Sequence, residues 1–240
     1  MEASQLTGLH RFRRQWFRNW PRHAIYSLSE RYYEYRLGIV SSRFIKLSEL
    51  GIDDSLCGNY APVKYRTFFK MMNSIEIGEH DVFLDYGSGM GRAVIAAAAT
   101  YPLKRAIGID ISPELTRFAM HNLKNARERL QCNNVEFLTT DATSYVPSAD
   151  VTIVFFNNPF KGSVLSAVVD NIHSSLVRQP RRLTIIYVNP RNYKTADADF
   201  EQYAKQSPWL VKTKEFSFYP PAEGCIYETT EVAPVSWTVK

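Results

Sequence analysis

From residue 81 onward, short apolar runs alternate regularly with longer segments of helical composition. The apolar runs are residues 81–85, 104–110, 134–139, 151–156 and 183–188. The helical segments between them are residues 90–100, 112–129 and 162–177. Near-continuous apolar strands that alternate with helices are typical of a parallel sheet with both faces covered. The pattern therefore predicts an α/β fold, with Ser112 as the N-cap and Pro113 as the first residue of one helix.

The pattern changes near the C-terminus. Residues 209–218 and 225–232 are two further strand-like runs, separated by the segment Tyr219–Gly224 with its two prolines. Two strands joined by a turn-rich segment favour an antiparallel hairpin. We therefore expect seven strands, of which the last two close the sheet in antiparallel fashion.

The N-terminal segment differs from the rest of the chain in charge. Residues 1–46 contain nine Arg or Lys and three Glu, a formal charge of +6, whereas the whole chain carries +5 and the remainder is close to neutral. Between residues 10 and 36, arginines alternate with aromatic residues, and Pro21 separates two expected helices. We interpret residues 1–57 as a basic, aromatic, helical extension and residues 58–240 as the main domain.

Two roles for the extension stay open. As a structural cap, it packs its aromatic residues on the domain and leaves arginines in water. As a substrate lid, it uses Arg11, Arg13, Arg14 and Arg18 to attract an acidic substrate. An Arg-rich, acid-poor opening is also found in mitochondrial leaders, although the heavy aromatic content argues against one.

The composition excludes several classes of protein. With 240 residues, 45% of them hydrophobic and 22% charged, the chain has the balance of a soluble globular protein. It contains no apolar run near the roughly 18 residues that a membrane span needs. The three cysteines form no CxxC pair and the five histidines are scattered, so we expect neither disulfides nor a metal site. A reducing compartment, the cytoplasm, is the expected location.

A glycine-rich loop, Asp85-Tyr86-Gly87-Ser88-Gly89-Met90-Gly91-Arg92, lies between an apolar run and an alanine-rich helix. Glycines permit close approach of a ligand to the backbone, and the helix N-terminus offers free N–H groups. The nicotinamide fingerprint requires a glycine where this chain has Arg92, and the phosphate-binding P-loop requires a lysine that is absent. The short G-x-G-x-G form suits a cofactor with a carboxylate and no pyrophosphate.

Acidic residues follow three successive strands. Asp85 begins the glycine loop, Asp110 ends the second strand, and Asp141 follows the third. The carboxyl ends of neighbouring parallel strands meet at one crevice, where a carboxylate can accept hydrogen bonds from ribose hydroxyls or an adenine amino group. Each aspartate alone is as readily a cap or a turn residue. The ordered set together with the glycine loop favours a cofactor that contains adenosine.

These residues give the sequence its resemblance to the class I S-adenosylmethionine-dependent methyltransferases, over roughly residues 58–232. The resemblance rests on VFLDYGSGMGRAVIAAA, on IGID with Asp110, and on LTTDAT with Asp141. It implies a Rossmann-like fold, S-adenosylmethionine as cofactor and S-adenosylhomocysteine as product. The implied cofactor contacts are Tyr60, Pro62, Asp85, Gly87, Ser88, Gly89, Gly91, Asp110, Ile111, Asp141, Ala142 and Asn157.

The segment before the glycine loop resembles one subgroup of these methyltransferases. Gly58-Asn59-Tyr60-Ala61-Pro62, followed by a helix and then by DYGSGMGR, is most similar to the non-SET histone-lysine methyltransferase group and its bacterial relatives. The likeness implies that Tyr60 and Pro62 close over the methionine end of the cofactor. It also implies a protein or peptide substrate with a lysine-like acceptor. The alternative for Tyr60 is an aromatic residue packed at a loop.

The most apolar strand ends in Asn157-Asn158-Pro159-Phe160. In the amino-methylating enzymes that the chain resembles, the matching motif is Asp/Asn/Ser-Pro-Pro-Tyr/Phe. Asn157 and Phe160 match its two ends, which implies that Asn157 orients the acceptor nitrogen and Phe160 packs beside it. Asn158 departs from the pattern, and a strand-to-helix turn with an asparagine cap is the alternative. Tyr65, Asp197 and Glu223 are candidates for a base by residue type alone.

Methylation of a protein or peptide nitrogen is the leading functional interpretation. The alternatives are methylation of a small metabolite, methylation of a nucleic-acid base stacked on Phe160, and a non-catalytic binding module. The near-neutral domain counts against nucleic acid, although the basic extension favours it. The intact set of glycines and aspartates argues against a non-catalytic module.

Overall fold

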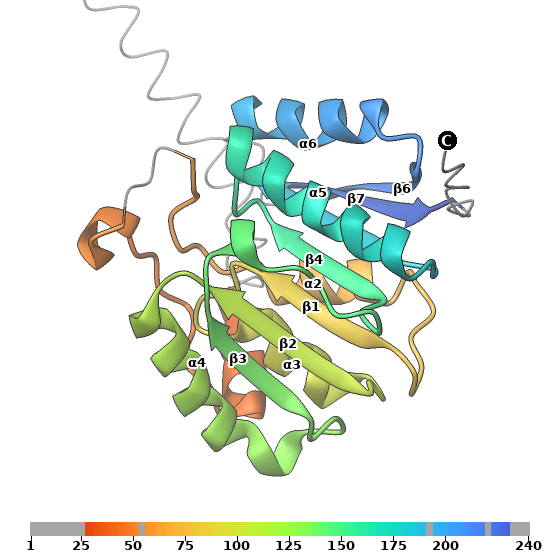
Figure 1. The fold of residues 1–240 in the computed structure, drawn as a ribbon. Helices are drawn as coiled ribbons and strands as arrows, with labels where there is room; N and C mark the ends of the chain where they lie inside the picture. The colour runs from red at the N-terminus through yellow and green to blue at the C-terminus, as the bar shows by residue number, and fades with distance from the viewer. Residues whose placement is uncertain (1–26, 53–55, 191–193, 219–221, 231–240) are drawn as a thin grey trace, which may run out of the picture.

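The computed structural model describes residues 27–52, 56–190, 194–218 and 222–230. A seven-stranded sheet in the order β3-β2-β1-β4-β5-β7-β6 forms its centre (Figure 1). The strands are β1 (Val82–Tyr86), β2 (Arg105–Asp110), β3 (Val135–Thr139), β4 (Ile153–Asn157), β5 (Thr184–Pro190), β6 (Leu210–Phe218) and β7 (Ala222–Thr229). The α-helices labelled in Figure 1 are α2 (Tyr65–Met72), α3 (Arg92–Thr100), α4 (Pro113–Ala126), α5 (Gly162–Arg178) and α6 (Lys194–Gln206).

Strands β3, β2, β1, β4 and β5 pair in parallel, and β7 runs antiparallel to both of its neighbours, β5 and β6. β1 pairs in parallel with both β2 and β4, and β5 pairs in antiparallel fashion with β7, which pairs with β6. The predicted α/β fold, a mostly parallel seven-stranded sheet closed by an antiparallel hairpin, is confirmed. The hairpin departs from the prediction in one detail, because β7 begins at Ala222 and so includes residues assigned to the turn.

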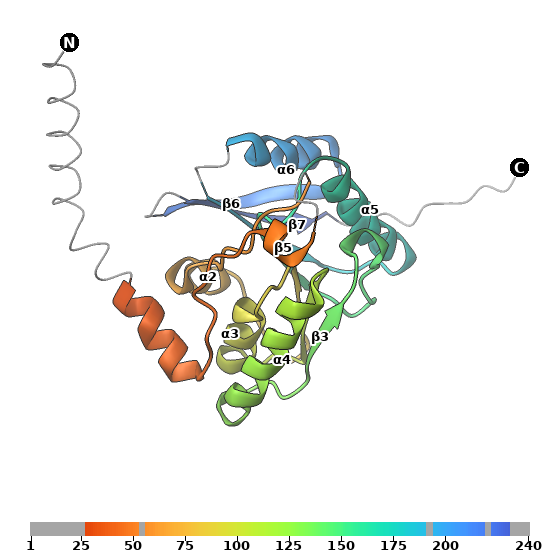
Figure 2. The same cartoon turned by 90° about the vertical axis from the view of Figure 1, so that its left-hand side faces the viewer.

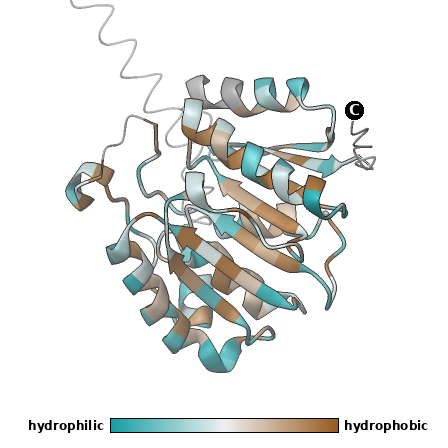
Figure 3. Ribbon diagram, viewed as in Figure 1, coloured by the Kyte–Doolittle hydropathy of each residue, from teal (hydrophilic) through white to brown (hydrophobic). Residues whose placement is uncertain are grey.

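Helices cover both faces of the sheet, as expected (Figure 2). Helices α2, α3 and α4 pack on one face in a cluster that includes Phe68, Val94 and Phe155. Helices α5 and α6 pack on the other face in a cluster that includes Val169, Phe156 and Phe200. The central strands β1 and β4 are almost wholly buried because they contact both layers, and Figure 3 shows their hydrophobic colour.

The parallel pairing places the ends of four strands at one edge of the sheet. Tyr86 of β1 lies beside Ile109 of β2 and beside Phe156 of β4. Asp110 of β2 lies beside Thr139 of β3 in the same way. The loops that follow these strands therefore gather at this edge, where open α/β sheets bind their ligands. Ser112 accepts a hydrogen bond from Leu115 N, which confirms the predicted N-cap of α4.

Residues 27–52, which we expect to belong to the N-terminal extension, pack on the rest of the structure, since Leu37 and Ile39 lie in the same core cluster as Phe68. Residues 27–37 are helical, in the region expected for the second helix, and a 3₁₀ helix, η1, spans Leu47–Leu50. Ile45 forms an isolated antiparallel bridge with Tyr60, and Cys57 forms one with Phe160. Residues 1–26, with the arginines assigned to substrate attraction, lie outside the described residues. No helix within the described ranges is long and apolar enough to cross a membrane.

Candidate active site

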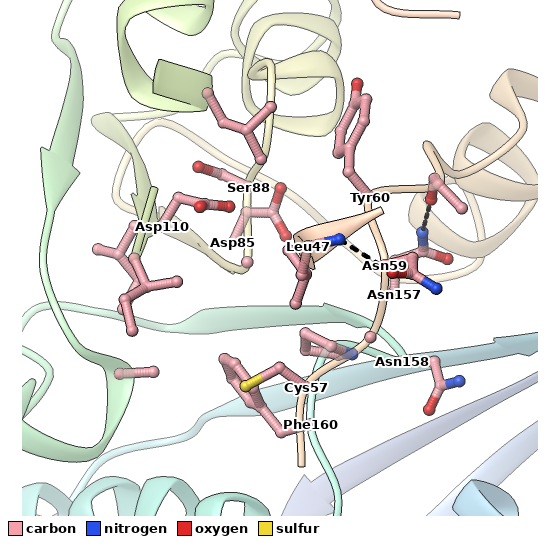
Figure 4. A pocket seen from close by; sticks show the side chains of 18 of the residues that line it. Leu47, Cys57, Asn59, Tyr60, Asp85, Ser88, Asp110, Asn157, Asn158 and Phe160 are labelled. Carbon is pink, nitrogen blue, oxygen red and sulfur yellow. Dashed lines mark hydrogen bonds between the residues drawn. The ribbon is translucent and has the colours of Figure 1, made fainter. Parts of the chain in front are cut away.

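The glycine loop forms one wall of a pocket at the carboxyl edge of the sheet (Figure 4). The amides of Gly87 and Ser88 both donate to Ile109 O at 2.9 Å, which holds the loop against β2. Gly89 has a φ of 54°, and a Cβ there would lie 2.2 Å from the Tyr60 ring. Glycine fits this position because the close approach of Tyr60 excludes a Cβ, and the left-handed backbone conformation also favours glycine.

Asp110 ties the loop to the next helix. Its Oδ2 accepts from Gly89 N at 2.8 Å, and its Oδ1 accepts from Ser112 N at 2.9 Å. A carboxylate has about four acceptor positions, so both oxygens can still accept from ribose hydroxyls. Burial raises the pKa of Asp110, although the two amide hydrogen bonds lower it. Asp110 is therefore a structural support of the loop as well as a candidate ligand contact, a double role that the sequence did not indicate.

Asp85 is the most exceptional side chain of the pocket. It is 3% exposed, and its Oδ1 is buried without a hydrogen-bond partner. Burial raises the pKa of this carboxyl well above its ordinary value, and the nearby charge of Asp110 raises it further. Buried carboxylates are normally paired. An unpaired carboxylate oxygen at the floor of a pocket fits the ammonium group of an amino-acid ligand, such as the methionine part of the expected cofactor.

The residues that follow β3 form another part of the pocket wall. Asp141 is the N-cap of the 3₁₀ helix η3 (Ala142–Ser144), since its Oδ1 accepts from the amide and the hydroxyl of Thr143, each at 2.8 Å. Ala142 is buried, whereas Ile111 is 44% exposed at the rim. Asp141, Ala142 and Ile111 all line the pocket, on the loops that follow β3 and β2. This placement agrees with the expected contacts to the adenine end of a ligand.

Tyr60 and Pro62 line the pocket near the end of β4, because Ala61 O between them accepts from Asn157 Nδ2, and β4 is separated from β3 by β1 and β2. The Tyr60 hydroxyl donates to Ser41 O at 2.9 Å, and its backbone exchanges two hydrogen bonds with Ile45. Asn59 Oδ1 accepts from Leu47 N at 3.0 Å, which brings Leu47 over the pocket. The simpler alternative for Tyr60, packing at a loop, is therefore true of its ring, but the same ring also forms part of the pocket wall.

The Asn157–Phe160 segment enters the pocket from the end of β4. Asn157 Nδ2 donates to Ala61 O at 2.8 Å, so the amide oxygen is the group that can accept from an incoming N–H. Asn158 adopts a φ of 48°, and its Oδ1 accepts from Tyr187 at 3.1 Å. Phe160 is 8% exposed and lies edge-on to Tyr86. This end of the pocket is neutral and largely apolar.

The structure gathers most of the predicted site residues and adds others. Every predicted residue lines the pocket except Gly89 and Gly91, which shape it from the loop backbone. Lining residues that the sequence did not single out include Leu47, Cys57, Asn59, Leu115, Thr143 and Val164. These residues reach the pocket through contacts between segments far apart in the sequence, which no local sequence pattern indicates. Arg92 also lines the pocket, and a sequence signal for it does exist. A cation at a helix N-terminus opposes the helix dipole and therefore indicates a buried acidic partner.

Of the three candidate bases, the two whose side chains the structure describes, Tyr65 and Glu223, are not brought to the acceptor end of the pocket. Tyr65 is fully buried in the core, and burial raises its pKa to about 12. Glu223 lies on β7 and does not line the pocket, and the side chain of Asp197 lies outside the described residues. Within the described ranges, no group of three or more His, Cys, Asp or Glu side chains is placed to hold a metal ion.

Comparisons with known proteins agree with this geometry. A family model described as "Histone methylation protein DOT1" matches residues 58–217. A histone-lysine N-methyltransferase specific for H3 lysine 79, from Drosophila melanogaster, is 33% identical over 191 residues, or 75% of this chain and 9% of the relative. A protein-lysine N-methyltransferase from Saccharolobus islandicus is 31% identical over 65 residues, or 27% of this chain and 40% of the relative. The chain thus spans less than half the length of each relative.

Solved structures share the fold. An RNA methyltransferase from Salinibacter ruber, in complex with S-adenosyl-L-homocysteine, has a TM-score of 0.52 at 23% identity. The likeness covers 73% of this chain and 97% of that one. At this level of identity, the comparison establishes the Rossmann-like fold of class I methyltransferases.

Because Asp85 Oδ1 is buried without a partner, we expect replacement of Asp85 by a neutral residue to stabilise the ligand-free protein. A carboxyl whose pKa is raised by folding binds its proton more tightly in the folded state, so stability falls as pH rises from about 3.9 through the raised pKa. We expect Asp85→Asn to raise the melting temperature of the ligand-free protein at pH 7.5 by about 2–4 °C, the shift that corresponds to roughly 1 kcal/mol. The gain should disappear at low pH, where the wild-type carboxyl is already neutral.

Thermal unfolding at pH 4 and pH 7.5 measures this difference. Asp81→Asn is the matched control, because Asp81 accepts hydrogen bonds from Gly78 N and from the Thr152 hydroxyl. The control variant should melt below wild type. A lower melting temperature for Asp85→Asn at pH 7.5 would show that the Asp85 carboxylate has a stabilising partner.

Proposed function

The chain belongs to the family of DOT1 histone methylation proteins, and we propose that it methylates a nitrogen atom on a protein or peptide. S-adenosylmethionine, the methyl donor of this fold class, is its cofactor, and the acceptor is a lysine-like amine. The carrying observation is that Asn157, at the end of β4, faces the pocket lined by Asp85, Asp110 and Asp141. Donor contacts and an acceptor-orienting amide therefore share one cavity.

Different residues of the pocket contact different parts of the methyl donor. Asp110 accepts hydrogen bonds from the ribose hydroxyls, and Asp141 with Ala142 contacts the adenine. The unpaired Oδ1 of Asp85 accepts from the ammonium group at the other end, where Tyr60 and Pro62 exclude water. When bound, the cofactor supplies a methyl group on a sulfonium that is already activated toward a nucleophile. The residues of this chain therefore act chiefly through proximity, orientation and exclusion of water.

Orientation of the acceptor falls to Asn157. Its Nδ2 is fixed by Ala61 O, so its Oδ1 accepts a hydrogen bond from the target nitrogen and aims the lone pair at the methyl group. The neighbouring side chains of Cys57, Pro159 and Phe160 offer neither a carboxylate nor an imidazole. Burial among them lowers the pKa of an incoming amine, because the charged form loses its hydration.

The burial of Phe160 favours an amine over a nucleic-acid base. A base flipped into the pocket would require an exposed aromatic face for stacking. Phe160 is instead 8% exposed, with its ring packed against Tyr86. An aliphatic amine needs no exposed aromatic face, so the burial of Phe160 suits it better than a planar base. The near-neutral domain agrees with a protein substrate, and the chain's expected location remains the cytoplasm.

The proposal is tested by incubating the protein with methyl-tritiated S-adenosylmethionine and a cell lysate, and counting protein, nucleic-acid and small-molecule fractions separately. We expect label in the protein fraction, released by protease digestion and recovered as methylated lysine after acid hydrolysis. Asp110→Ala is the negative control, since it loses the ribose contact. Label that resists protease and is removed by ribonuclease would contradict the protein substrate. Absence of label from every fraction would contradict the methyltransferase assignment.

Asn157→Ala should harm the chemical step and leave donor binding nearly unchanged. A misplacement of the acceptor of about 1 Å costs roughly 10²-fold in rate, so we expect kcat to fall by about that factor. The dissociation constant of S-adenosylhomocysteine should change less than about twofold, because its ribose and adenine contacts lie on other strands. Steady-state kinetics on the identified acceptor and calorimetric titration measure the two quantities. Asn125→Ala, an exposed amide on α4, is the control. Full kcat in Asn157→Ala would exclude Asn157 from acceptor orientation.

A further inference from the structure

Arg92 donates five hydrogen bonds and pairs with two carboxylates. It is the first residue of α3, directly after the glycine loop, and it is 3% exposed. Its Nε donates to Ser41 Oγ at 2.8 Å. Its Nη1 donates to Glu30 and to Val63 O, and its Nη2 donates to Glu34 and to Ser42 Oγ. All five N–H groups of the guanidinium are therefore used, within a site almost closed to water.

The electrostatics explain why an arginine can occupy this position. A cation in the first turn of a helix opposes the helix dipole, and a buried cation loses its hydration. The two carboxylates of Glu30 and Glu34 offset both effects, with Glu34 Oε1 at 3.0 Å from Nη2. Burial acts to raise the pKa of Glu34, but the Ser41 hydrogen bonds and the Arg92 charge together lower it. The guanidinium also lies 4.4 Å from the centre of the Tyr65 ring.

The partners of Arg92 lie on the chain that leads into the pocket wall. We call residues 41–50 and 56–63 the strap. Arg92 holds its first end through Ser41 and Ser42, and its last residue through Val63 O at 3.0 Å. Between these two ends, the strap contributes Leu47 and Tyr60 to the pocket.

Tyr60 links the strap directly to the same network. Its hydroxyl donates to Ser41 O, and Ser41 Oγ accepts from Arg92. The Tyr60 ring rests against Gly89, at the position where a Cβ would lie only 2.2 Å away. A single residue after the glycine loop thus fixes the distance between the loop and the ring that covers it. The network is attached to the loop after β1, whereas Asp141 follows β3, two strands away in the sheet.

We propose that Arg92 is a positioning residue for the methyl donor: it holds the strap over the glycine loop so that Tyr60 and Leu47 enclose the amino-acid end of the ligand. The role rests on the proposed function, because it presupposes S-adenosylmethionine in this pocket. It also assigns a purpose to the extension, whose residues Glu30 and Glu34 complete the site. Loss of Arg92 should weaken binding of the amino-acid group of the ligand and leave binding of its adenosine group unchanged.

Two ligands separate these ends. S-adenosylhomocysteine carries the amino-acid group, whereas 5′-methylthioadenosine lacks it and contacts only the ribose and adenine subsites. In calorimetric titrations, Arg92→Met should bind S-adenosylhomocysteine at least about tenfold more weakly than wild type and methylthioadenosine within about twofold. Arg105→Met is the matched control, because Arg105 also pairs with two carboxylates, Glu136 and Asp150, at the amino end of β2. The control should bind both ligands as wild type does.

Two more variants distinguish a specific loss of ligand binding from a loss of folding. Arg92→Met leaves two carboxylates unpaired, so the triple variant R92M/E30Q/E34Q removes the charges together and should show the same selective loss. Tyr60→Phe removes only the hydroxyl that reaches Ser41, and it should weaken S-adenosylhomocysteine selectively by a smaller factor.

The outcomes of the titrations are distinct. Selective loss of S-adenosylhomocysteine affinity in the folded variants supports the role of Arg92. Equal loss for both ligands, or full retention of both, overturns it, and if neither Arg92 variant folds, Tyr60→Phe decides by the same criterion. Failure of the wild-type protein to bind either ligand overturns the proposed function itself, and the role of Arg92 with it.

Discussion

Parallel pairing of β1 with both β2 and β4 is the constraint on which the site depends. It places the loops after four strands at one edge of the sheet, so that Asp85, Asp110 and Asn157 face a common pocket although 72 residues separate the first from the last. The apolar composition of β1 and β4 keeps these strands in the centre, because each needs a helical layer on both faces. The site is therefore a consequence of the core, and its side chains occupy the first polar positions beyond it.

The unfavourable features of the structure are concentrated around this pocket. Asp85 is buried without a partner for Oδ1, and Asn158 adopts a left-handed conformation that few residues other than glycine favour. A cation occupies the first turn of α3. Such features persist only when the surrounding structure enforces them, and they gather at functional sites. Here the enforcing contacts are the packed faces of the sheet and the five hydrogen bonds of Arg92.

The parts of the structure that could be predicted from the sequence are those with a local pattern. The five parallel strands, the glycine loop, the Ser112 cap and the acids at the strand ends each follow from a few adjacent residues. Helix α6 was not predicted, because its sequence is polar and Phe200 and Ala204 are its buried residues among those described. The contacts of Arg92 with Glu30 and Glu34 span 62 and 58 residues, and no local pattern records them. The sequence showed an arginine where a dinucleotide site has glycine, but not its partners.

The role proposed for the strap and the glycine loop is to enclose the amino-acid end of S-adenosylmethionine. Hydrogen-exchange mass spectrometry of the full chain, with and without saturating S-adenosylhomocysteine, tests it most directly. With ligand bound, we expect slower exchange in peptides that cover residues 41–50, 56–63 and 86–92, with no change in β6. Slower exchange confined to peptides around Asp110 and Asp141, with the strap unaffected, would contradict it.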